Sequence, residues 1–187
     1  RKPGPRALVL APTRELATQI DAEIRLLAKF TRLKTTRVFG GVSMRAQIDA
    51  LRGRPEVVVA CPGRLLDLMR QRVIRLDKVE TLGLHEADHM FDMGFLPDIR
   101  KILGALPKRR RNLLFSATMP REIRRLADDL LEDPHVVELA DTAPVATVDH
   151  ALCLVAEQRK RALLEHILAR DDCNPALVFT RRPEEHT

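Results

Sequence analysis

Short, unbroken apolar runs alternate along this chain with stretches whose apolar residues recur at helical spacing. The runs lie at residues 7–10, 57–60, 82–84 and 113–115. A strand that is apolar on both sides belongs in a parallel sheet that is covered by helices on each face. The alternation of strand and helix therefore predicts an α/β fold built on a doubly wound parallel sheet.

Two of the intervening stretches have a clear helical face. The first places four apolar residues on one side of a helix: Leu16, Ile20, Ile24 and Leu27. The second does the same, and Pro120 suits its first turn: Ile123, Leu126, Leu130 and Leu131. We expect both faces to pack on the sheet.

The character of the sequence changes after Asp133-Pro134. Residues 140–147 are small or polar and include a proline, which is typical of a linker. A further strand–helix–strand unit is predicted from residues 151–156, a helix through Leu163, Leu164 and Ile167, and residues 176–179. We expect an incomplete first domain over residues 1–139, the linker over 140–147, and the start of a second domain over 148–187.

Charge and cysteine usage restrict the class of protein. The net charge of +6 and the pI of 9.7 favour polyanionic partners such as nucleic acid, although a basic solvated surface alone would give the same values. The three cysteines include no C-x-x-C pair, which argues against a disulfide framework and for a reducing compartment. Without a signal-peptide pattern or a membrane-length apolar run, we expect a soluble, cytoplasmic protein with no membrane partner.

Three predicted strands, which end near Leu10, at Val38-Phe39 and at Ala60, are each followed by small, proline or arginine residues that open a helix. These candidate nucleic-acid-binding residues are Pro12, Thr13, Arg14 and Glu15; Gly40 and Gly41, with Ser43 as a helix cap; and Pro62, Gly63 and Arg64. Helix N-termini offer free amides and a favourable dipole to phosphates. Together the three turns predict contacts to a nucleic-acid backbone without base reading, although each turn alone also fits ordinary turn chemistry.

The fourth strand leads into His85-Glu86-Ala87-Asp88. Carboxylates at a strand end are what magnesium-dependent phosphoryl transfer uses, one to hold the metal and one to orient or deprotonate water. Glu86 is the candidate for the second role. Ser116 and Thr118 follow the next strand and could hydrogen-bond Asp88, although a helix cap is the simpler interpretation of that motif alone.

In this order, the motifs resemble those of DEAD-box RNA helicases. The matching segments are P-T-R-E-L-A at 12–17, G-G at 40–41, P-G-R at 62–64, E-A-D at 86–88, D-M-G-F at 92–95 and L-F-S-A-T-M-P at 114–120. L-V-F-T at 177–180 is similar to the first motif of that family's second domain. The sequence as a whole is similar to bacterial members of the RhlE kind.

The resemblance implies two RecA-like domains that close on ATP, magnesium and single-stranded RNA, so that a short duplex separates. It implies that the three turns contact RNA, that Glu86 positions the hydrolytic water, and that Asp88 with Ser116 and Thr118 links nucleotide state to closure. It also implies an internal fragment. The G-x-x-x-x-G-K-[ST] phosphate loop, absent here, belongs upstream of Pro12, and the arginine finger belongs beyond Thr187. We expect this chain alone to hydrolyse no ATP at a useful rate.

Several positions depart from the family pattern. His85 stands where the family has the aspartate of the magnesium site, and imidazole is a poor ligand for a cation that prefers oxygen. We therefore expect weak use of magnesium-ATP. Gly83 replaces a residue that is usually β-branched, which would loosen the strand; His89 replaces an arginine, and Cys61 replaces a threonine.

Two alternatives stay open. His85 to His89 spells H-E-x-x-H, a zinc-protease pattern, but that pattern requires both histidines on one helix and a third ligand. The second alternative is a degenerate module that binds RNA without turnover.

Overall fold

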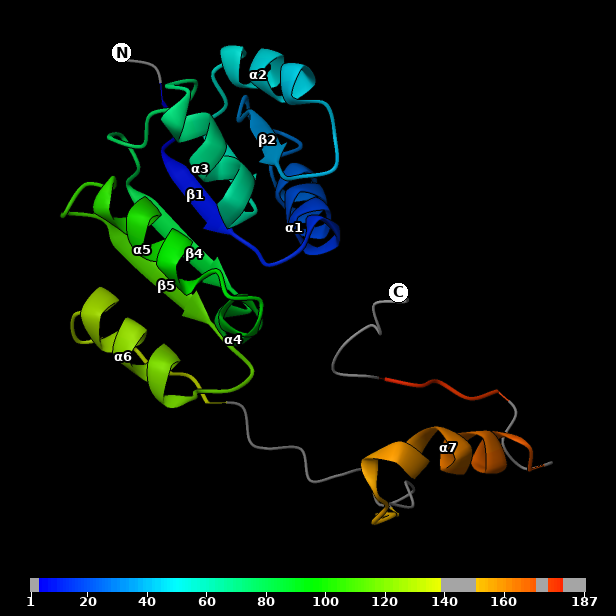
Figure 1. Ribbon diagram of the computed structural model, residues 1–187. Helices are drawn as coiled ribbons and strands as arrows, with labels where there is room; N and C mark the ends of the chain where they lie inside the picture. The colour runs from blue at the N-terminus through cyan, green and yellow to red at the C-terminus, as the bar shows by residue number, and fades with distance from the viewer. Residues whose placement is uncertain (1–3, 139–150, 171–174, 180–187) are drawn as a thin grey trace. The chain divides into compact units, whose positions relative to one another are not determined.

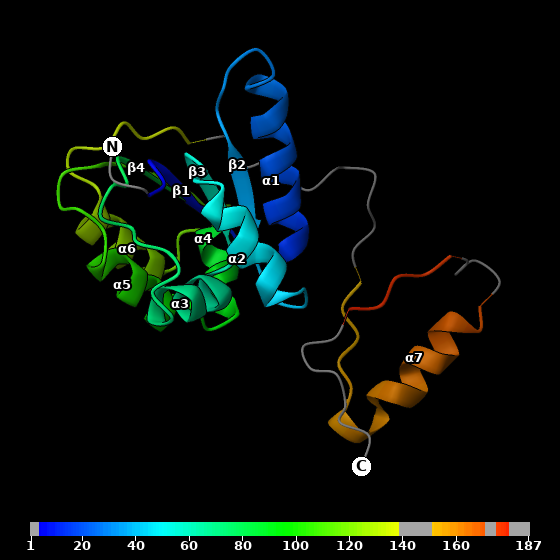
Figure 2. The same cartoon turned by 90° about the horizontal axis from the view of Figure 1, so that it is seen from above.

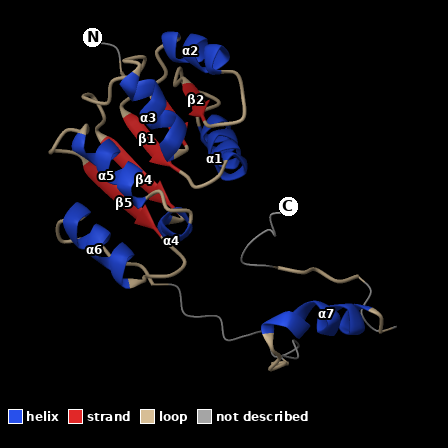
Figure 3. Cartoon of the chain, in the orientation of Figure 1, coloured by secondary structure: helices blue, strands red, loops and turns tan. Residues whose placement is uncertain are grey.

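The computed structural model describes residues 4–138, 151–170 and 175–179 (Figure 1). The chain divides into two compact units, Arg1–Val136 and Val137–Thr187, and each is described by itself. The first unit contains a five-stranded sheet with the order β2-β3-β1-β4-β5 (Figure 3). The strands are β1 (Ala7–Leu10), β2 (Thr35–Val38), β3 (Val57–Ala60), β4 (Thr81–His85) and β5 (Arg111–Phe115). All neighbouring strands are parallel, which confirms the predicted α/β fold.

Helices connect the strands and cover the two faces of the sheet. They are α1 (Arg14–Leu27), α2 (Met44–Arg52), α3 (Pro62–Arg70), α4 (Ala87–Asp92), α5 (Leu96–Gly104) and α6 (Arg121–Leu130). Figure 2 shows α1 on one side of the sheet and α3 and α5 on the other. Thr13 caps α1 by accepting a hydrogen bond from the Leu16 N–H, and Ser43 caps α2 in the same way from Ala46.

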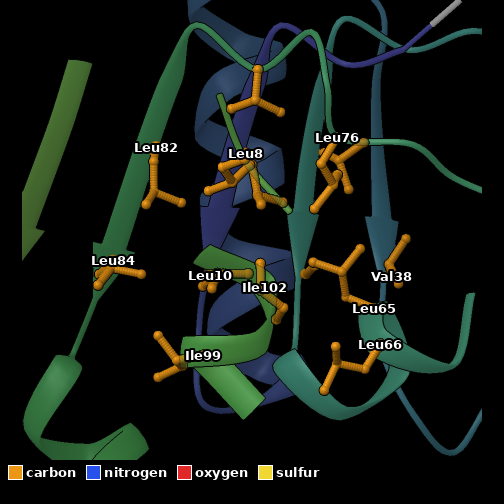
Figure 4. Packing of buried hydrophobic residues seen from close by; sticks show 14 of the residues in the cluster. Leu8, Leu10, Val38, Leu65, Leu66, Leu76, Leu82, Leu84, Ile99 and Ile102 are labelled. Carbon is orange, nitrogen blue, oxygen red and sulfur yellow. The ribbon is translucent and has the colours of Figure 1, made fainter. Parts of the chain in front are cut away.

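The main core lies between the strands and the helices α3 and α5 (Figure 4). Leu8 and Leu10 of β1 are fully buried against Ile99 and Ile102 of α5. On the opposite face, Val59 packs with Ala17 and other apolar residues of α1. Burial of each such side chain contributes about 1.5–3 kcal/mol, so the doubly apolar strands account for the layered arrangement.

One helical prediction is wrong in its last residue. Leu27 was expected on the packed face of α1, but its side chain is 82% exposed. The 14 residues of α1 extend over roughly 21 Å, whereas a four-residue strand extends over roughly 13 Å. The last turn of α1 therefore runs past the end of the sheet, and Leu27 has no strand beneath it.

The second unit contains η1 (Glu157–Arg159) and α7 (Lys160–Leu168). The predicted helix is present, but residues 151–156 and 175–179 form no strand, which corrects the predicted strand–helix–strand unit. A strand requires a hydrogen-bonded neighbour, and within the described part of this unit neither segment pairs with another. The predicted linker at 140–147 lies outside the described residues. Among the residues described, no helix has the length and apolar character needed to cross a membrane.

Candidate functional site

The predicted site residues gather along one edge of the sheet. In the parallel register, Leu10 lies beside Ala60 and Leu84, and His85 lies beside Phe115. The carboxyl ends of the strands consequently meet at a single edge, which we call the carboxyl edge (Figure 1). Ligands bind outside this edge in open α/β sheets.

The three turns predicted to bind nucleic acid contact one another. Arg64 Nη1 donates a hydrogen bond to the Val42 carbonyl oxygen at 3.2 Å, which joins the turn after β3 to the turn after β2. A Cβ atom built on Gly41 would lie 3.6 Å from Arg14 Nη1, so the guanidinium of α1 borders the same turn. Gly41 has a φ of +77°, a backbone conformation that favours glycine. The structure therefore brings Arg14, Gly41 and Arg64 together.

Arg14 also pairs with its neighbour on the carboxyl edge. Arg14 Nε donates to Glu15 Oε1 at 2.7 Å, and both side chains are exposed. This hydrogen bond raises the pKa of Arg14 and lowers the pKa of Glu15. Both groups are therefore charged at neutral pH, and Glu15 limits the positive charge that Arg14 presents.

Gln47 of α2 is a buried residue of this region that the sequence reasoning missed. Its side chain is 6% exposed, and its Oε1 accepts from the Phe39 N–H at 2.9 Å while its Nε2 donates to the Phe39 carbonyl oxygen at 3.1 Å. The available signal was a polar residue on the same helical face as Met44 and Leu51, which pack against the core.

Cys61 stands at the end of β3, where it precedes Pro62. Burial, together with the nearby charge of Glu15, raises the pKa of its thiol to about 11. The side chain makes no capping hydrogen bond to α3, unlike Thr13 and Ser43 at the other two turns. Cys61 is thus a neutral, partly buried thiol at physiological pH.

Asp88 is joined to the turn after β5, as the sequence predicted. Asp88 Oδ2 accepts from Thr118 Oγ1 at 2.7 Å and from the Thr118 N–H at 2.8 Å. Ser116 Oγ accepts from the Asp88 N–H at 3.1 Å and donates to the Thr118 carbonyl oxygen at 2.7 Å. Burial works against ionisation of Asp88, but the hydrogen bonds from Thr118 and from the His89 N–H outweigh it and hold its pKa below the usual value.

Glu86 connects β4 to α4 in a left-handed backbone conformation, with φ 55° and ψ 58°. This conformation is uncommon outside glycine and occurs often at functional sites. The Glu86 carboxylate lies 3.1 Å from His89 Nδ1, and both side chains are partly exposed. The candidate base is therefore held by a residue of its own helix.

His85 is the last residue of β4, and its ring lies against Phe115 of β5 with ring centroids 5.7 Å apart. Its Nδ1 atom is buried and has no hydrogen-bond partner. The two nearby acids are engaged, Glu86 by His89 and Asp88 by Thr118. A ring nitrogen is a poor ligand for magnesium, which prefers oxygen, so the residue at position 85 does not fit this ion.

The zinc-protease alternative is not supported by this geometry. His85 lies on β4 and His89 on α4, with the left-handed Glu86 between them, so the two histidines do not share a helix. Nowhere in the described ranges do three or more His, Cys, Asp or Glu side chains gather in a way that could hold a metal ion. The H-E-x-x-H spelling is therefore coincidental.

Comparison with known proteins points to one family. The family model described as DEAD/DEAH box helicase matches residues 1–126. The chain is 41% identical over 180 residues to the DEAD-box ATP-dependent RNA helicase RhpA of Helicobacter pylori, covering 96% of this chain and 37% of that protein. It is 39% identical over 180 residues to the helicase CshA of Bacillus subtilis, covering 96% of this chain and 36% of that protein.

Solved structures agree with these relatives. A hypothetical ATP-dependent RNA helicase from Sulfolobus tokodaii superposes with a TM-score of 0.67 at 42% identity, over 71% of this chain and 40% of the other. The yeast DEAD-box splicing factor Prp28 gives 0.65 at 34% identity, over 70% and 31% of the two chains. The chain spans little more than a third of the length of the curated relatives it matches.

Proposed function

Because the chain belongs to the DEAD/DEAH box helicase family, we propose that it is part of an ATP-dependent RNA helicase and that its carboxyl edge holds the backbone of RNA. The observation that carries the proposal is the convergence of Arg14, Gly41 and Arg64. Two guanidinium groups and a glycine turn offer charge and exposed amides to phosphate oxygens. Such contacts track a single strand, or one strand of a short duplex, without reading its bases.

The N-termini of α1 and α3 add to this interface. Both helices begin at the carboxyl edge, at Arg14 and Pro62. Pro62 has no N–H, but the other N–H groups of each first turn lack partners within the helix. The partial positive charge of a helix N-terminus favours a phosphate group. Thr13, Pro12 and Gly63 belong to the same turns and shape the approach to these amides.

The bond between Asp88 and Thr118 is proposed to transmit the state of the nucleotide. It ties the loop after β4 to the loop after β5, so a shift of one loop moves the other. Glu86 is proposed to position the water that attacks ATP. ATP use is a property of the family, and a phosphate-binding loop would have to accompany this chain for turnover.

A second candidate function is RNA binding without ATP turnover, and His85 specifically favours it. Magnesium normally accompanies ATP in this chemistry, yet the imidazole of His85 does not suit that ion.

The two domains predicted for the chain remain part of the proposal: a first RecA-like domain to residue 139 and a second from residue 148. A cytoplasmic location, based on cysteine usage, is also part of it.

Fluorescence anisotropy with a labelled oligouridine tests the RNA interface. We expect the double variant Arg14→Ala/Arg64→Ala to bind roughly 10-fold more weakly and to lower the salt dependence of binding by about one to two phosphate contacts. Arg6→Ala is the matched control, because Arg6 is an exposed arginine paired with Glu80 at the opposite end of β1. An equal loss in both proteins would exclude the carboxyl edge as the interface.

A further inference from the structure

We propose that Gln47 is a positioning residue, which sets the backbone of the Gly40-Gly41 turn for its contact with RNA. The role rests on the proposed function, since it concerns one turn of the carboxyl edge. Gln47 does not face RNA, because its side chain is 6% exposed and lies behind the turn. It acts through the backbone of Phe39, the residue that immediately precedes the two glycines.

The Gln47 side chain takes the place of a neighbouring strand for the backbone of Phe39. Regular pairing of β2 with β3 ends at Val38 and Ala60, and the last bond of this edge runs from the Cys61 N–H to the Val38 carbonyl oxygen at 2.8 Å. Phe39 comes next, beyond the sheet. The Gln47 amide supplies both an acceptor and a donor to Phe39, at 2.9 and 3.1 Å, as a neighbouring peptide group would.

Helix capping does not explain these bonds. Ser43 already caps α2 through the Ala46 N–H, and the backbone of Gln47 makes its own helical bond to the Ser43 carbonyl oxygen. The side-chain Nε2 also donates to the Ser43 carbonyl oxygen at 3.5 Å, but the two shorter bonds of the side-chain amide run from the helix to the strand end. A buried amide satisfied on both of its groups fixes the position of its partner closely.

The turn is consequently held at both ends and open between them. Phe39 is fixed by Gln47, and the Val42 carbonyl oxygen accepts from Arg64 at 3.2 Å. A Cβ built on Gly40 would meet no atom within 4 Å, so the space over this residue is open. By fixing Phe39, Gln47 thus sets the position of the uncovered backbone of Gly40 on the carboxyl edge.

A purely structural role and a positioning role predict different RNA affinities for the folded protein. If Gln47 only stabilised the fold, its loss would lower stability and leave the affinity of the folded protein for RNA unchanged. If it positions the turn, affinity falls even where the protein is fully folded. Asn112 of β5 provides the matched control, because its side-chain amide also donates to a backbone carbonyl oxygen, that of Leu130, at 2.7 Å. β5 lies at the edge of the sheet opposite to β2.

The experiment measures oligouridine affinity of the 187-residue chain by anisotropy, at a temperature where circular dichroism shows each protein folded. Gln47→Met keeps the length of the side chain and removes both hydrogen bonds to Phe39, together with the longer one to Ser43. We expect it to weaken binding about fivefold to tenfold, the scale of one or two hydrogen bonds lost. Gln47→Glu keeps the acceptor for the Phe39 N–H but turns a second oxygen toward the Phe39 carbonyl oxygen, so it should also bind RNA more weakly than the wild type. Asn112→Ala should bind RNA as the wild type does.

Glycine-selective NMR supplies the second readout, since the chain has only eight glycines. In Gln47→Met we expect the amide signals of Gly40 and Gly41 to move, and those of Gly63 and Gly104 to stay. RNA affinity equal to wild type in a folded Gln47→Met protein, or unmoved Gly40 and Gly41 signals, overturns the positioning role. A wild-type chain that binds no RNA overturns the proposed interface itself, which is a distinct result.

Discussion

At the scale of single residues, His85 is the departure with the largest chemical effect. Its buried Nδ1 has no partner, and it replaces a hard oxygen ligand with a nitrogen. In a protein that joins this chain to a phosphate-binding loop and a second domain, we expect His85→Asp to raise magnesium-dependent ATPase activity roughly 10-fold or more. Steady-state phosphate release with saturating RNA measures the gain.

His85→Asn is the control for this substitution, because it supplies a polar oxygen without the negative charge. If the aspartate variant gains no more activity than the asparagine variant, charge at position 85 does not limit turnover. The family would then have to tolerate an imidazole at its magnesium site.

The contribution of the Asp88–Thr118 hydrogen bond to the free energy of unfolding should depend on pH. The pKa of Asp88 is lowered in the folded state, so its contribution to stability is present above the unfolded-state value near 3.9 and is lost as the pH falls through the folded-state value. Thr118→Val removes the 2.7 Å hydrogen bond to the carboxylate. We expect it to lower the free energy of unfolding by about 1 kcal/mol at pH 7 and by much less at an acidic pH below the folded-state pKa of Asp88.

Urea unfolding at both pH values gives the comparison, with Thr18→Val as the control. Thr18 Oγ1 donates to the Arg14 carbonyl oxygen inside α1, so no carboxylate takes part and its effect should not vary with pH. A constant effect of Thr118→Val across this range would show that Asp88 is not the group that binds the hydroxyl.

Residue types carried most of the site prediction, whereas backbone conformations could not be predicted. The pairing of Asp88 with Thr118 followed from two motifs at neighbouring strand ends. The left-handed conformation of Glu86 left no trace in the sequence, because glutamate has no preference for it. Gln47 was missed because its partners are backbone atoms of Phe39, which any residue type at position 39 would provide.

At the scale of elements, β4 forms without interruption despite Gly83. The strand pairs with β1 and β5 along its length, and Gly83 lies beside Val9 and Leu113. A Cβ on Gly83 would meet only the two methyl groups of Val9, at 3.7 Å, which is ordinary contact. Gly83→Ala should therefore raise the free energy of unfolding by roughly 0.5–1 kcal/mol, because it removes the entropy cost of glycine in a strand and adds only the Cβ for which there is room.

Thermal and urea unfolding measure this gain, and Gly41→Ala serves as the opposing control. Gly41 has a φ of +77°, so a residue with a Cβ must destabilise the turn there. A loss of stability in Gly83→Ala would mean that the face of β4 beside Val9 is more crowded than the contact distances indicate.

The strands that the sequence predicted well are the ones buried on both faces. β3 is buried along its whole length, and its unbroken valine run identified it at once. β2 was recognised only at its carboxyl end, because it lies at the edge of the sheet and alternates between buried and exposed residues, with Arg37 exposed. The strands predicted at 151–156 and 176–179 failed for a related reason, since apolar character alone does not provide a pairing partner.

At the scale of the whole molecule, the proposed RNA interface and the requirements for ATP turnover can be tested separately. The carboxyl edge gathers Arg14, Gly41 and Arg64, while the 187 residues contain no phosphate-binding loop. We expect the isolated chain to bind oligouridine in a salt-dependent manner and to show no RNA-stimulated ATPase activity. Anisotropy titrations at several salt concentrations and a phosphate-release assay test both halves.

RNA-stimulated ATP hydrolysis that disappears in Glu86→Gln would contradict this expectation and would show that the isolated chain is an ATPase. The family itself was predictable because several short motifs occur in a fixed order, and the match over residues 1–126 confirms it. The similarity to the RhlE kind stays a prediction, since the relatives named above are RhpA and CshA helicases.

The position of β5 has a consequence for handling the protein. β5 is the last strand of the sheet, and among the described residues its outer side faces no other strand, while Leu113 and Phe115 are 42% and 52% exposed. Open strand edges with apolar side chains are the templates for edge-to-edge aggregation. We therefore expect a charged substitution at Leu113 to raise the solubility of the protein.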